Sequence, residues 1–124
     1  MKTLWISPPE AINGATDMSY QFLDTNLSVK LQYFYKGEQK VIILQFYHVS
    51  GVLFVKNNLC NYYTELNNSS FESLVQIENS PWISSLKQND IYQELDQYQH
   101  YVFANQNDGQ IEVLSKGYKI FLLQ

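Results

Sequence analysis

The sequence predicts an α+β fold, an antiparallel sheet of about five to seven strands with one or two short helices. Runs of alternating apolar and polar residues are separated by turn residues such as Gly37, Gly51 and Gly109, which is typical of antiparallel strands. Ser80-Pro81 places a capping hydroxyl before a first-turn proline, as at the start of a helix. With 124 residues, 45% of them hydrophobic, the chain suits a single domain over 1–124 that buries its own core.

The first predicted hairpin covers 28–48 and turns at Gly37-Glu38. That turn gathers apolar residues on one face, which we assign to the core, while the other face is mixed. The core face carries Val29, Leu31, Tyr33, Ile42, Leu44 and Phe46. The mixed face carries Lys30, Gln32, Phe34, Val41, Ile43 and Gln45. Shorter strands are predicted at 52–55, 71–77 and 118–123, and the polar segment 57–70 is predicted to be a long loop.

The helical signal lies between these strands. Trp82, Ile83 and Leu86 follow Ser80-Pro81 with helical spacing. Asp90 is a candidate cap for a second short helix. The apolar stripe of that helix would be Ile91, Leu95 and Tyr98.

The second predicted hairpin turns at Asp108-Gly109. Counting outward from this turn pairs Ala104 with Val113, and Val102 with Ser115. One face then holds Val102, Ala104, Ile111 and Val113, and the other holds Tyr101, Phe103, Glu112, Leu114 and Lys116. Because both faces contain apolar residues, we expect this hairpin to be central in the sheet or covered on both sides.

Charge excludes several classes of function. All eight basic residues are lysines, whereas the chain has twelve carboxylates and a net charge of −4. Without arginine the chain lacks the planar donor fork that grips phosphate in two places. A net negative charge also repels nucleic acid and anionic lipid. We therefore expect no nucleic-acid or membrane partner.

Candidate catalytic residues are few. His48 ends one predicted strand and His100 begins another, so antiparallel neighbours could bring them together with a carboxylate around a metal. The alternative is that each histidine is an ordinary strand-end residue. Cys60 has no cationic neighbour to lower its pKa, which favours an inert thiol. Asp90, Glu94 and Asp96 cluster, but a solvated helix face is the default explanation for them. We therefore expect no enzyme activity, no metal and no cofactor.

Cellular location is predicted from two features. The single cysteine excludes an internal disulfide, which suits a reducing compartment. The first residues also lack the apolar stretch of about 7–15 residues that a signal peptide needs. We expect a cytoplasmic protein.

Aromatic residues point to a binding surface. The chain has ten tyrosines, seven phenylalanines and two tryptophans, more than the predicted strand interiors require. Tyrosine and tryptophan often anchor protein interfaces, because they combine a large rigid area with a polar group. The predicted contact residues are Tyr62, Tyr63 and Glu65 in the long loop, and Asp90, Glu94 and Asp96. A tyrosine-rich core with ordinary surface acids is the alternative.

Residues 80–115 resemble a family of known proteins. The pattern consists of Ser80-Pro81-Trp82-Ile83, Leu86, His100-Tyr101-Val102-Phe103, Asp108 and Ile111-Glu112-Val113. It is similar to small bacterial immunity-type proteins of contact-dependent inhibition and other polymorphic toxin systems. Leu114-Ser115 departs from it, because a small residue usually follows the Glu-x-x stretch.

The resemblance implies a single α+β domain that binds and neutralises a cognate toxin domain, often a basic nuclease. It carries over no catalytic residue, because immunity families share none. Two other functions stay open from the sequence. One is a structural or regulatory domain that self-associates through an exposed strand edge, which would make it a homo-oligomer. The other is a small metal-dependent hydrolase that uses His48, His100 and a carboxylate.

Overall fold

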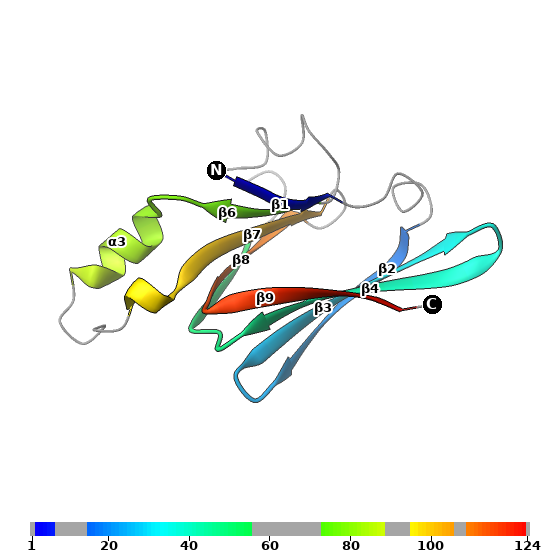
Figure 1. The fold of residues 1–124 in the computed structure, drawn as a ribbon, viewed down its shortest axis with the longest axis horizontal. Coiled ribbons are helices and arrows are strands. Elements are labelled where there is room, and N and C mark those ends of the chain that lie inside the picture. The colour runs from blue at the N-terminus through cyan, green and yellow to red at the C-terminus, as the bar shows by residue number, and fades with distance from the viewer. Residues whose placement is uncertain (1, 7–14, 56–72, 89–94, 106–108, 124) are drawn as a thin grey trace.

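The computed structural model describes residues 2–6, 15–55, 73–88, 95–105 and 109–123. They form two antiparallel sheets that face each other, with a short helix and a 3-10 turn at one end (Figure 1). The first sheet has the order β1-β6-β7-β8-β5, and the second has the order β2-β3-β4-β9. The strands are β1 Lys2–Ile6, β2 Ala15–Leu23, β3 Asn26–Tyr35, β4 Glu38–Tyr47, β5 Gly51–Val55, β6 Ser73–Ile77, β7 Gln99–Asn105, β8 Gly109–Ser115 and β9 Gly117–Leu123.

The architecture confirms antiparallel strands with little helix, but the predicted single sheet of five to seven strands is wrong. The described residues form nine strands in two sheets, so the fold is mainly β. A sheet with an apolar face needs another layer to cover that face. With one short helix among the described elements, a second sheet provides this layer. The additional strands β1 and β2 lie in residues 2–23, over which the sequence predicts no element.

The β3–β4 hairpin confirms the predicted core face. All six residues predicted for that face are buried. The turn is Lys36-Gly37, one residue earlier than predicted, with Tyr35 paired to Glu38. Both turn residues have positive φ angles, 53° and 77°, as in the type I′ turn that suits a two-residue hairpin. Because the pairing differs from the prediction by an even number of residues, each side chain keeps its predicted face.

The β7–β8 hairpin corrects the second prediction. Val102 pairs with Glu112 and Ala104 with Gln110, three residues away from the predicted pairing. A shift by an odd number of residues moves side chains to the opposite face of the sheet. Tyr101 and Phe103 therefore share a face with Ile111 and Val113 rather than with Leu114. Apolar residues on both faces leave the register weakly specified, which explains the error. The predicted central position is confirmed, since each of the two strands has a neighbour on both sides.

The core lies between the two sheets. Phe46 of β4 contacts Tyr101 of β7, with ring centroids 5.6 Å apart. At one side of the sandwich Tyr20 of β2 packs edge-on against Phe54 of β5, at 5.2 Å. The buried residues of the main cluster are Leu27, Val29, Leu44, Phe46, Leu74, Tyr101, Phe103, Ile111 and Val113. Burial of these side chains decides which face of each strand is turned toward the other sheet.

The predicted helix start is confirmed. Helix α3 covers Pro81–Lys87, and the Ser80 hydroxyl accepts the backbone N–H of Ile83, which leaves the helix capped. Of the second predicted helix the structure shows a single 3-10 turn, η2 Leu95–Gln97. Asp90, its predicted cap, and the predicted loop 57–70 lie outside the described residues. In the described part of the chain, no helix has the length and apolar character needed to cross a membrane.

The β3–β4 turn provides a stability test. Gly37 has φ +77°, which an L side chain rarely adopts, so we expect Gly37→Ala to destabilise the fold by about 1 kcal/mol. Gly117→Ala is the matched control, because a Cβ there meets open space and the backbone is not left-handed. Urea unfolding of both variants measures the difference. Equal unfolding midpoints would contradict the assignment of the turn.

Candidate functional site

The predicted contact residues fall mostly outside the described part of the chain. Tyr62, Tyr63, Glu65, Asp90 and Glu94 lie outside it. Asp96 is exposed on η2 and forms an ion pair with Lys87 at the end of α3. The hydrogen bond and the positive charge of Lys87 hold the pKa of Asp96 below its usual value of 3.8. Asp96 is therefore already paired within this chain, which weakens it as a contact for a partner.

The structure does not bring the two histidines together as neighbours on paired strands. His48 is exposed just after β4, in the second sheet, and its backbone N–H donates to Asn26 Oδ1 at 3.2 Å. His100 is buried on β7, in the first sheet. Cys60 lies outside the described residues. Among the described His, Cys, Asp and Glu side chains, no group of three or more is arranged to hold a metal ion.

His100 instead joins two other polar side chains in the protein interior. Its Nδ1 lies 2.7 Å from Ser80 Oγ, and its Nε2 lies 2.7 Å from Glu112 Oε1. Gln110 Nε2 donates to the other carboxyl oxygen of Glu112 at 2.9 Å. A consistent assignment puts the ring proton on Nε2, so that Glu112 accepts it and Nδ1 accepts the Ser80 hydroxyl proton. The four residues are at most 5% exposed.

The same residue types act in hydrolases where a histidine activates a serine. Here the Ser80 oxygen also accepts the backbone N–H of Ile83 and caps α3. Trp82, one residue into the helix, packs edge-on against the His100 ring at 5.3 Å. A Cβ on Gly51, the first residue of β5, would lie 3.0 Å from the Trp82 ring, so helix and sheet approach closely. These contacts make the polar cluster a tie between α3 and the first sheet.

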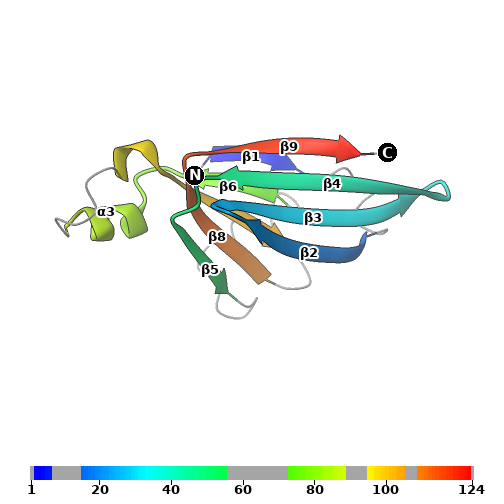
Figure 2. The ribbon, with the colours of Figure 1, turned by 90° about the horizontal axis from the view of Figure 1, so that it is seen from below.

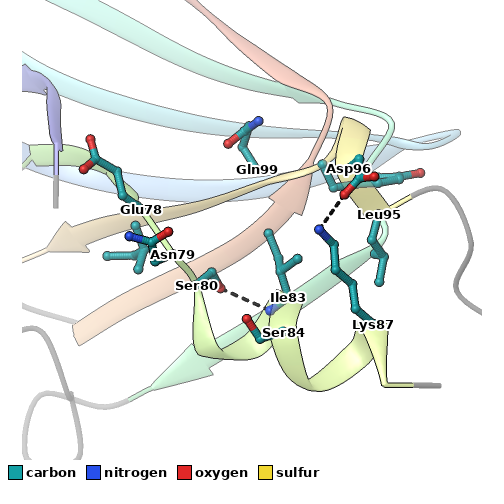
Figure 3. A pocket seen from close by; sticks show the side chains of 11 residues that line it. Glu78, Asn79, Ser80, Ile83, Ser84, Lys87, Leu95, Asp96 and Gln99 are labelled. Atoms are coloured by element: carbon teal, nitrogen blue, oxygen red, sulfur yellow. Dashed lines mark hydrogen bonds and ion pairs between the residues drawn. The ribbon is translucent and has the colours of Figure 1, made fainter.

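A polar cleft opens beside this tie (Figure 3). Its volume is about 260 Å³. The Lys87–Asp96 ion pair lies at its side, joining α3 to η2. The lining residues are Ile77, Glu78, Asn79, Ser80, Ile83, Ser84, Lys87, Leu95, Asp96, Tyr98 and Gln99. Lys87 and Asp96 neutralise each other in this ion pair. Neither of these two charges is therefore left unpaired for a ligand in the cleft.

An exposed apolar surface lies on the other sheet. On the face of β4 and β9 turned away from the core, Ile43 pairs with Phe121, and Val41 with Leu123. Figure 2 shows these two strands side by side, with β9 at the edge of the sheet. Phe121 is 41% exposed and Leu123 is 50% exposed. We call these four residues, Val41, Ile43, Phe121 and Leu123, the apolar edge patch.

Lysines border the apolar edge patch. Lys119 precedes Phe121 by two residues on the same face of β9, and its ammonium lies over the Tyr47 ring, 5.4 Å from the centroid. Lys30 of β3 pairs with Ile43 and is exposed on the same face. On this face of β3, β4 and β9 the charged side chains that the structure describes are Lys30 and Lys119. The patch is thus apolar with a basic border.

Comparison with protein-family models, with curated proteins and with solved structures finds no match for this chain.

The apolar edge patch could be predicted only in part from the sequence. The mixed face of the first hairpin already contained Phe34, Val41 and Ile43, but β9 carries the other half of the patch. Strand order decides whether those halves meet, and no local sequence signal encodes it.

Because His100 helps to hold α3 against the first sheet, we expect the two histidines to differ in their contribution to the free energy of unfolding. We expect His100→Ala to lower the free energy of unfolding by about 3 kcal/mol or more, because it removes a large buried ring and one donor from the buried Glu112. His48→Asn is the matched control, since His48 is exposed and has φ +51°, which asparagine tolerates. Urea unfolding monitored by tryptophan fluorescence gives both values. Similar stabilities of the two variants would contradict the assigned role of His100.

The Lys87–Asp96 pair predicts a pH effect. In Lys87→Met we expect the pKa of Asp96 to rise toward 3.8, because its charge partner is lost. A lowered folded-state pKa adds stability above the unfolded-state pKa, and this stability is lost as the pH falls through the folded-state value. Carboxyl-carbon NMR titration of Asp96 measures the shift. An unchanged Asp96 pKa in Lys87→Met would show that the pair does not form in solution.

Proposed function

We propose that this protein acts by binding another protein, without catalysis of its own, and that its partner is a toxin domain that it neutralises. The apolar edge patch is the observation that supports a binding function. Contiguous apolar surface with a polar border is typical of protein interaction sites. The resemblance of residues 80–115 to immunity-type proteins supports the finer assignment of the partner.

Charge is distributed unevenly between the second sheet and the rest of the chain. Residues 15–47 and 117–123, which contain the strands of the second sheet, hold four of the eight lysines but three of the twelve carboxylates. The second-sheet segments are therefore slightly positive, and the remaining segments carry all of the net negative charge. The net negative charge of the whole protein attracts a basic toxin over a distance, whereas the apolar edge patch, with its basic border, would contact an acidic and apolar part of that toxin at close range. The acidic side chains would then govern mainly the rate of association.

Self-association is the second candidate function. It is favoured by the position of β9, which is paired to β4 on one side and is the last strand of its sheet. An unpaired strand edge is a template for another strand, including one from a second copy.

A binding titration with variants tests the proposal. We expect the domain encoded by the neighbouring upstream gene to bind with nanomolar affinity, about −12 kcal/mol. Phe121→Ala should weaken that binding by about 2 kcal/mol, as for a central aromatic anchor. Phe54→Ala is the matched control, because Phe54 is 58% exposed on the other sheet, and it should change the affinity by less than about threefold.

The same titration separates the two candidate surfaces. A loss of affinity on alanine replacement of Asp90, Glu94 and Asp96, with none for Phe121→Ala, would move the interface to the acidic residues. No binding at micromolar concentration would reject that domain as the partner. A concentration-dependent dimer of the protein alone would then favour self-association.

A further inference from the structure

The four edge strands of the two sheets differ in their ability to receive another strand. The pairing of β1 is interrupted between Thr3 and Trp5, and that of β2 between Ala15 and Asp17. Such irregularities twist an edge and discourage further pairing. β5 is regular but has five residues. β9 is regular along all seven residues, from Gly117 to Leu123, and is therefore the edge best suited to strand addition.

Side chains beside this edge form an ordered series. Along β9, residues 119, 121 and 123 share the outer face, and Gln45, Ile43 and Val41 lie beside them on β4. The series along the edge is therefore one lysine followed by two apolar residues. A strand added to β9 would lie about 4.8 Å away, with alternate side chains on the same outer face. Each of those side chains would meet one member of the series.

Charge selects the occupant of the edge. A carboxylate opposite Lys119 would be favoured, whereas a lysine there would be repelled. A second copy of this chain would bring β9 itself, whose sequence Gly-Tyr-Lys-Ile-Phe-Leu-Leu contains a lysine and no carboxylate. The edge and its basic border therefore fit an acidic, apolar segment of a different protein better than a second copy.

We propose that β9 is a strand-addition site, which receives an extended segment of a partner protein with a carboxylate opposite Lys119 and apolar residues opposite Phe121 and Leu123. The added strand runs antiparallel to β9, as every paired strand described in this protein does. Read from its N-terminus, the segment then has the pattern apolar-x-apolar-x-acidic. Backbone hydrogen bonds supply affinity, and the alternate side chains supply specificity. This inference rests on the proposed function, because it specifies how the partner is held.

A charge-swap experiment tests this site with the full-length protein. The probe is the acetylated and amidated peptide Thr-Val-Thr-Ile-Thr-Glu-Thr, labelled with a fluorophore and followed by anisotropy. We expect Lys119→Glu to weaken its binding about tenfold, since an attraction becomes a repulsion. The same peptide with Lys in place of Glu should bind Lys119→Glu better than it binds the unmodified protein. Lys2→Glu, on the β1 edge, is the control and should leave both affinities unchanged.

The outcomes distinguish this inference from the proposed function. Equal affinities for both peptides, or failure of the charge swap to restore binding, would overturn the strand-addition site. Binding of the upstream-encoded domain without protection of the β9 amides from hydrogen exchange would also overturn it, while leaving the proposed function intact. A dimer in sedimentation analysis that Phe121→Ser abolishes would assign the edge to a second copy and overturn the acidic-partner assignment. Restored binding in the swapped pair supports it.

Discussion

The packing of the two sheets around Phe46, Tyr101 and Phe103 determines which of the remaining side chains are exposed and available to a partner. Each fully buried side chain of this size contributes about 1.5–3 kcal/mol relative to an exposed one. Because side chains alternate along a strand, burying one face of β3 and β4 turns the other face to solvent. Lys30, Ile43 and Val41 are on that outer face for this reason. The candidate binding surface is thus a geometric consequence of the core.

A second constraint fixes the helical end of the molecule. The buried contacts of His100 with Ser80 and Glu112 hold the start of α3 against the first sheet. Removing either partner leaves a buried polar group without its hydrogen bond, which is costly in a protein interior. The sequence pattern over residues 80–115 includes all three of these side chains. Their hydrogen bonds give these three residues of the pattern a structural role.

Sequence patterns predicted the strands well where one face of a hairpin is clearly more apolar than the other. In the first hairpin the core face was correct even though the turn is Lys36-Gly37 rather than Gly37-Glu38. In the second hairpin both faces are apolar, so nothing penalises a shifted register, and the predicted pairing was three residues off. β2 was missed although Met18, Tyr20 and Phe22 alternate with polar residues, because its turn at Asp24-Thr25 lacks glycine. Asp24 adopts the positive φ instead.

The candidate surface was less predictable than the strands. The apolar edge patch requires β9 to pair with β4 across about 75 residues of sequence, a long-range choice set by packing of the two sheets. Tyr62, Tyr63, Glu65 and the acidic cluster were predicted as contacts because aromatic and charged residues can be recognised in a sequence without knowledge of the topology. Of that set, Asp96 lies in the described residues and is paired with Lys87.

Hydrogen exchange of the complex with the upstream-encoded domain tests the central claim most directly. If the partner binds at β9, the Gly117–Leu123 amides exchange more slowly in the complex, with no change in Gly51–Val55 at the edge of the other sheet. Protection confined to residues 57–70 and 90–96, with β9 unchanged, would contradict it. That result would place the interface on the tyrosine and acidic residues rather than on the apolar edge patch.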